Sequence, residues 1–271
     1  MILKLNNQSK ILLSSHRYEK NNVEMLTSIK RLASGVKLHQ AADNASGLAI
    51  SEKLRAQLRG TSQAERNMQD GLSVLQAANE GLNNVNALLQ RAREISVMAA
   101  NDTLIAEDRN ASQMEMDQLM EGINDTAEKL QFNTKKILGE NAPLTLMVGA
   151  NPQQQIKIDL IDISTTALGL TSTSIASHQD SSKLIAELDH AITFVTNHTE
   201  KIGSYYEAIE HHMTNAMNYE TNITSSFSKI HDTDMAKETL NFLSVGIRQN
   251  GDKLLVKQVN QDLKDVLKLF S

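Results

Sequence analysis

Histidine is the residue type in this sequence best suited to binding a metal or transferring protons. The chain has eight histidines, and His211 and His212 are adjacent. Adjacent side chains on a helix point about 100° apart. Zinc sites on helices need two histidines at i and i+4 with a nearby carboxylate, a pattern that the sequence lacks. We therefore predict surface histidines, no metal site and no cofactor.

Other catalytic residue patterns are also missing. The sequence contains no cysteine, which excludes disulfides and thiolate catalysis. It has no glycine-rich phosphate-binding loop and no Ser, His and Asp arrangement that stands out above chance. The sequence therefore predicts that the protein is not an enzyme, and its helical elements carry the remaining information.

Composition favours a mainly α protein of one or two domains. Of the 271 residues, 40% are apolar but only 3% are aromatic, so Ala, Leu, Ile and Met must supply the packing, as in helical bundles. Pro143 and Pro152 are the only prolines. Because both lie in the middle of the chain, helices can run uninterrupted on either side.

Charge and hydropathy argue against nucleic acid and membrane as partners. A formal net charge of −5 argues against nucleic acid, although residues 1–60 carry ten Lys or Arg against four acidic residues. No apolar run of about 18 residues exists to cross a membrane. The N-terminal segment has neither a long apolar region nor a small-residue cleavage site. If the protein is exported, we expect a route without a cleaved signal peptide.

A heptad seam dominates residues 188–230. Apolar residues recur every third or fourth position, interrupted only by Thr199 and Glu220. A helix of this length measures roughly 65 Å and needs another long helix against its stripe. Residues 62–100 supply one, beginning after Gly60 with Ser62 and Glu65 as a capping box. A third helix over residues 105–130 completes an expected three-helix rod.

The middle of the chain changes its period. Residues 144–148 and 156–160 alternate between apolar and polar, and Gly149 to Pro152 form a turn signal between them. Alternation on both sides of a turn predicts a β-hairpin at about 144–162. Residues 171–182 are rich in Ser and Thr and are expected to form a loop.

Both ends of the chain are expected to be helical. Residues 10–33 form a helix that Ser34-Gly35 ends, and a short helix over residues 48–58 follows, capped by Asp43 or Asn44. A break at residues 231–234 precedes the last helical region, whose final seam is Val256, Val259, Leu263, Val266 and Phe270. Asn250-Gly251 is expected to divide or kink that region.

The two ends are expected to act together. Each is too short to be a stable helix alone, so we expect disorder until it meets a partner helix. The predicted domains are terminal arms, residues 1–45 and 231–271 with their helices side by side, and a helical rod, residues 46–230, that contains the hairpin.

Several motifs between about residues 34 and 240 resemble bacterial flagellins. In chain order they are Ser34-Gly35, Ala42 to Glu52, Gln69-Asp70-Gly71, Gln90 to Glu94, Ala99 to Asp102, Phe132 to Leu138 and Asp232 to Glu238. The resemblance implies a self-assembling subunit of the extracellular flagellar filament, in a minimal form without an outer domain. It also implies partners: other flagellin subunits, with the arms as inner filament core, and the flagellar export machinery with an export chaperone.

The resemblance also implies site residues. In flagellins the segment matching residues 90–95 is a contact between subunits and the patch bound by an animal Toll-like receptor. The matching candidates here are Gln90, Arg91, Glu94, Ile95 and, on the next helix, Glu115. As an alternative, Arg91 and Glu94 are simply solvated and Ile95 lies on the core stripe.

The ends depart from the family pattern. Residues 247–257 carry bulky and charged side chains where flagellins typically have small ones, and such side chains in close packing cost about 1–3 kcal/mol each. One alternative is therefore a divergent flagellin-like protein that polymerises poorly. Another is the related junction protein between hook and filament, and a third is a membrane-active helical protein.

Overall fold

The computed structural model describes residues 2–268, with side chains for residue 9 and residues 12–261. Within these limits the fold is mainly α with a small β region, as predicted. The elements are α1 (Ile2–Ser34), α2 (Ala45–Ala99), α3 (Ala106–Lys129), β1 (Gln131–Phe132), β2 (Lys135–Lys136), β3 (Pro143–Met147), β4 (Gln155–Asp159), α4 (His178–His231) and α5 (Met235–Lys268).

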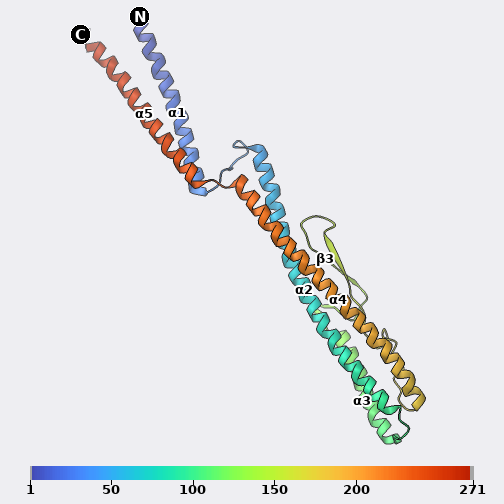
Figure 1. The fold of residues 1–271 in the computed structure, drawn as a ribbon. Helices are drawn as coiled ribbons and strands as arrows, with labels where there is room; N and C mark the ends of the chain where they lie inside the picture. The colour runs from blue at the N-terminus through green and yellow to red at the C-terminus, as the bar shows by residue number, and fades with distance from the viewer. Residues whose placement is uncertain (1, 269–271) are drawn as a thin grey trace. The chain divides into compact units, whose positions relative to one another are not determined.

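The chain divides into two compact units. We call Met1–Arg55 with Ile223–Ser271 the arm unit, and Ala56–Asn222 the bundle unit. These limits fall inside α2 and α4, whereas the sequence placed the boundaries near helix ends. Figure 1 shows α1 and α5 side by side in the arm unit, and α2 and α4 side by side in the bundle unit.

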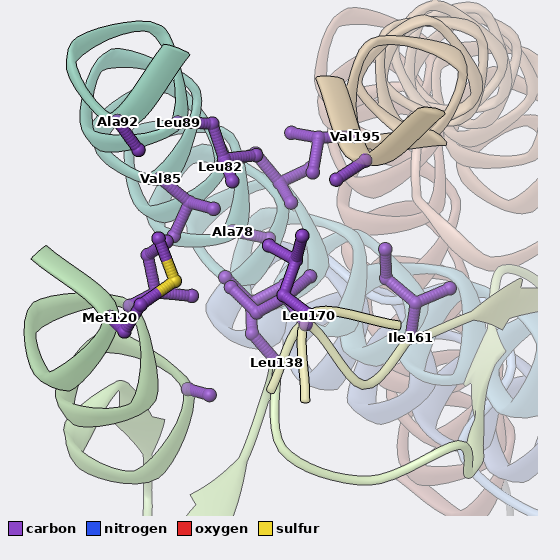
Figure 2. Close-up of a cluster of buried hydrophobic side chains, with 14 of the residues drawn as sticks. Ala78, Leu82, Val85, Leu89, Ala92, Met120, Leu138, Ile161, Leu170 and Val195 are labelled. Carbon is purple, nitrogen blue, oxygen red and sulfur yellow. The ribbon is translucent and has the colours of Figure 1, made fainter. Parts of the chain in front are cut away.

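The bundle unit has one hydrophobic core between its three helices. Leu82 and Leu89 of α2, Met116 of α3 and Val195 of α4 are fully buried. Figure 2 shows these helices converging on the core, with Leu138 and Leu170 closing it from the connecting segments. Burying one such side chain contributes about 1.5–3 kcal/mol. The predicted packing of three helices along the heptad seam is confirmed.

Helix α2 corrects the prediction of a break at Gly60. It runs unbroken from Ala45 to Ala99, so Ser62 and Glu65 lie in a helix interior and form no capping box. Gly60 has another purpose, because a Cβ added there would lie 2.7 Å from the Cβ of Ala150 in the hairpin turn. A Cβ at Gly71 would likewise lie 2.5 Å from Leu146. These glycines let the hairpin approach the helix closely.

The predicted β-hairpin is confirmed. Strands β3 and β4 are antiparallel, with Leu144 opposite Ile158 and Leu146 opposite Ile156. The alternation turns these residues toward the core, where Ile158 is fully buried. A second, shorter pair, β1 and β2, was not predicted. Its turn residues Asn133 and Thr134 both have positive φ, 47° and 67°, as a two-residue hairpin turn requires.

Helix α4 begins earlier than predicted, at His178. Ser177 caps it, because its Oγ accepts from the backbone N–H of Asp180 at 3.1 Å and donates to the Asp180 carboxylate at 2.6 Å. The predicted loop over residues 171–182 is therefore wrong beyond Ser177. Serine is common in loops and also at helix caps, so the Ser-rich segment contains both a loop and the cap of α4.

The ends of the arm helices follow the predicted signals. Gly35, with φ of 70°, terminates α1, and Asn44 Oδ1 caps α2 by accepting from the N–H of Gly47 at 2.9 Å. Asp234 Oδ1 caps α5 by accepting from Lys237 N at 3.1 Å. The predicted break at residues 231–234 is thereby confirmed.

The predicted interruption of the last helix is wrong, because α5 continues through Gly251 to Lys268. Phe270 lies outside the described residues. Helices α1 and α5 run antiparallel, as shown by the contacts Tyr18 with Lys253 and Glu24 with Arg248. That each arm helix is disordered until it meets a partner helix stays a prediction.

Candidate subunit interfaces

An ion-pair cluster centred on Arg91 lies on the surface of the bundle unit. Arg91 Nε donates to Glu115 Oε1 at 2.8 Å, and Arg91 Nη1 donates to Glu94 Oε2 at 3.0 Å. Because Glu115 is on α3, the guanidinium links α2 to α3. The hydrogen bond to Glu115, followed by that to Glu94, raises the pKa of Arg91. The side chains are 44–68% exposed, so they remain accessible to a partner.

The two remaining candidates occupy different environments. Gln90 is exposed, and its amide donates to Asn86 Oδ1 at 3.3 Å. Ile95 is only 2% exposed and belongs to the hydrophobic core. The heptad period of α2 thus places Ile95 on the core stripe, and its side chain offers no surface to a partner. The structure brings Arg91, Glu94 and Glu115 together but not Ile95.

Exposed apolar side chains lie near this cluster in the chain. Val97 and Met98 at the end of α2 are about half exposed, and Met114 on α3 is 69% exposed. Met116 and Met120 are buried in the core, whereas Met98 and Met114 are exposed. These exposed residues add an apolar component to the candidate surface.

The α1 and α5 pair has its polar side chains inside. The residues buried in it include Asn21, Ser28, Gln249 and Asp252, each 8% exposed or less, together with Val245. Asn21 Nδ2 donates to Asp252 Oδ2 at 2.7 Å across the pair. Asn21 and Asp252 therefore satisfy each other, as buried polar groups generally must.

Many of the large apolar side chains of these helices are exposed. We call them the outer arm faces: Leu12, Leu13, Val23, Leu26 and Ile29 on α1, and Leu240, Leu243, Ile247, Leu254 and Leu255 on α5. All are between 44% and 73% exposed. Large exposed apolar surfaces mark sites of interaction. The outer arm faces are therefore the strongest candidate for a subunit contact.

A junction joins the chain segments where the arms begin. The backbone N–H of Lys37 donates to the carbonyl of His231, and that of Thr233 donates to the carbonyl of Gly35, both at 2.8 Å. Arg55 Nη2 lies 3.1 Å from His231 Nε2, and the His231 ring stacks on Phe227 at 4.5 Å. These contacts hold the end of α1 to the end of α4.

The partners of His231 define its tautomer. Since a guanidinium can only donate, Nε2 accepts from Arg55, and Nδ1 carries the hydrogen that it donates to Asp232 Oδ1 at 2.8 Å. This hydrogen bond, followed by one from Ser228, lowers the pKa of Asp232. Sequence reasoning missed Arg55 and His231 as a pair, because 176 residues separate them.

Two family models match the chain. Residues 5–142 match the bacterial flagellin N-terminal helical region, and residues 185–270 match the bacterial flagellin C-terminal helical region. The chain belongs to the bacterial flagellin family. These matches extend beyond residues 34 and 240, so the ends are closer to flagellin than the motifs alone indicated.

Curated flagellins match nearly the whole chain. The flagellin of Halalkalibacterium halodurans is 36% identical over 246 residues, covering 90% of each chain. That of Bacillus subtilis is 31% identical and covers 99% of this chain and 100% of its own. The crystal structure of Bacillus cereus flagellin is 26% identical, covers 56% of this chain and 88% of its own, and has a TM-score of 0.52.

Membership of this family makes the protein a structural subunit of the bacterial flagellar filament, which is extracellular. The two curated relatives described above are both flagellins, and each covers nine-tenths or more of this chain. Within the described residues, no three His, Asp or Glu side chains are grouped to hold a metal. None of the described helices has the length and apolarity to cross a membrane.

Proposed function

We propose that subunits assemble into the filament through the outer arm faces, with residues 1–45 and 231–271 forming the inner core of the filament. The observation that carries this proposal is the reversed polarity of the α1 and α5 pair. Leu240 is 69% exposed and Ile247 73% exposed, while Asn21 and Asp252 are buried. Covering one leucine or isoleucine contributes about 1.5–3 kcal/mol, so a neighbouring subunit gains stability by covering these faces.

The same geometry weakens the argument for poor polymerisation. Ile247, Leu254 and Leu255 point outward and do not crowd the contact between α1 and α5. Arg248 lies 3.2 Å from Glu24, so its charge is paired across the two helices. The bulky residues of α5 therefore cause no overpacking within the arm unit.

Seeded elongation tests the proposal. Purified protein is added to filament fragments, growth is followed by light scattering, and products are viewed by electron microscopy. The unaltered protein should grow long filaments, and Ile247→Glu should reduce elongation at least tenfold. Met217→Glu, at a 56% exposed position in the bundle unit, is the matched control and should elongate normally. Little growth by the unaltered protein would favour the poorly polymerising alternative.

The Arg91 cluster is a second proposed contact surface, for a neighbouring subunit and for an animal Toll-like receptor. Its support is the exposed guanidinium flanked by Glu94 and Glu115. Arg91→Ala should reduce receptor-dependent reporter signalling while the helical circular dichroism stays unchanged. Unchanged signalling by that variant would remove the receptor from the proposal.

Export is proposed to follow the flagellar route, with an export chaperone and without a cleaved signal peptide. The expected chaperone contact is an exposed arm helix, since apolar faces such as that of α5 must be shielded before assembly. The membrane-active alternative makes a different prediction, because the arms would then carry lipid vesicles upward in a flotation assay. Absence of the protein from the vesicle fraction would remove it.

A further inference from the structure

We infer that Asn21 and Glu24 on α1, with Arg248 and Asp252 on α5, fix the register in which the two arms pair. This inference rests on the proposed role of the outer arm faces only for its effect on filament growth. The register itself is a property of one chain and is measured separately.

The four residues form two contacts across the arms. Asn21 Nδ2 donates to Asp252 Oδ2 at 2.7 Å, and both residues are at least nine-tenths buried. Arg248 Nη2 lies 3.2 Å from Glu24 Oε2. A hydrogen bond and an ion pair are directional, so each is made at one relative position of the helices.

Apolar contacts alone cannot set this register. Val245 is the fully buried apolar residue of α5 in the described part of the arm pair. Apolar attraction has no direction, and helices with a repeating pattern keep the same faces together when they slide by one heptad. A slipped pair is therefore the main competitor of the native pair.

Sliding by one heptad in the first direction is unfavourable. It moves Arg248 from a position opposite Glu24 to one opposite Arg31, which brings two cations together. It also moves Asn21 from Asp252 to Val259. The amide then has no partner, and an unsatisfied buried polar group is destabilising.

Sliding by one heptad in the opposite direction fails for the same reasons. Arg248 then lies opposite Arg17, again a cation, and Asn21 lies opposite Val245. Each slip would also displace the outer arm face of α5 by about 10 Å along α1. The polar contacts thus select the alignment in which the two outer arm faces are presented together.

Spin-label distances in the full-length, unpolymerised protein test the inference. The chain has no cysteine, so Lys30→Cys and Asn241→Cys place one label on each arm, at exposed positions. With native polar residues we expect one narrow distance distribution. The double variant Asn21→Leu, Asp252→Leu should keep the helices paired but add a second distance population, from pairs whose helices have slid by about 10 Å along their axes.

Three comparisons make the result decisive. Lys20→Leu with Lys257→Leu, two exposed positions, is the matched control and should keep one distance. Arg248→Glu should broaden the distribution, and adding Glu24→Arg should restore it. A single native distance in the Asn21→Leu, Asp252→Leu variant, or a broad distribution with all polar residues intact, would overturn the inference. Seeded elongation is measured separately. If the protein with native polar residues shows one narrow distance but does not elongate filaments, the result counts against the proposed function and not against the register.

Discussion

The two units of this flagellin differ in which side chains their helices bury and which they expose. In the bundle unit, apolar residues such as Leu82 are buried between helices, whereas in the arm unit residues such as Leu240 face outward and Asn21 faces inward. The helices of the two units therefore differ in which side chains they bury within one chain. The bundle unit completes its core within one chain, while the arm unit presents apolar surface that another chain must cover.

The largest expected difference between the units comes from truncating a leucine. Leu82→Ala removes a fully buried side chain and should lower the free energy of unfolding by roughly 2–5 kcal/mol. Leu240→Ala, at a 69% exposed position, should change it by less than about 0.5 kcal/mol. Denaturant unfolding of the two unpolymerised variants measures this, and similar losses would show that both units have conventional cores.

A second comparison uses one substitution at two helical glycines. Gly60→Ala places a Cβ 2.7 Å from the Cβ and 3.2 Å from the Cα of Ala150 and should destabilise the bundle unit by about 1–3 kcal/mol. Gly246→Ala meets nothing within 4 Å and should stabilise α5 by up to about 1 kcal/mol. Thermal melts followed by circular dichroism report both effects. A stabilising substitution in the bundle unit together with a destabilising Gly246→Ala would contradict the packing described for the hairpin and the arms.

Glu65 in the bundle unit provides a smaller, pH-dependent test. Burial, and then the facing carboxylate of Glu220, raise the pKa of Glu65 above its ordinary value of 4.5. The folded state therefore binds the proton more tightly, and this stabilisation is lost as the pH rises above 4.5. Glu65→Gln should stabilise the fold at pH 7 by roughly 0.5 kcal/mol, with no gain in melting temperature below pH 4. A constant gain at every pH would point to a cause other than ionisation.

Asp232 in the arm unit should show the opposite sign and the smallest effect. Its pKa lies below the ordinary 3.8, chiefly because of the hydrogen bond with His231. The ionised carboxylate therefore stabilises the junction above that value, and the contribution disappears as the pH falls through the folded pKa. Since the side chain is half exposed, Asp232→Asn should cost only about a few tenths of a kcal/mol. Amide exchange of Thr233 should be faster in the variant at pH 7, and the difference from the unaltered protein should shrink as the pH falls below 3.8.

Much of the bundle unit could be predicted from its sequence because its signals are local and periodic. The heptad stripe of α4 and the alternation around Leu144 and Leu146 indicate which side chains pack in or against the core. Gly60 misled the prediction because its partner, Ala150, is distant in sequence. A helix stop and a close approach both call for glycine, and only the fold distinguishes them.

The arm unit was harder to predict for a related reason. Periodicity identifies which residues share a face but assumes that the apolar face is the buried one. In α1 and α5 the contact within the chain buries polar side chains beside Val245, so the apolar pattern did not predict the pairing of Asn21 with Asp252. Among the site candidates, Arg91 and Glu94 are exposed and Ile95 is buried. Their role in a contact stays a prediction.

Hydrogen exchange of the subunit before and after polymerisation tests most directly whether assembly completes the arm unit. Amides of the paired α1 and α5 helices should exchange faster in the free subunit, where their apolar faces are uncovered, than in the filament. Amides in the α2, α3 and α4 core around Leu82 should be protected in both states, because the bundle unit buries its own apolar residues. Arms with equal protection before and after polymerisation would contradict this account.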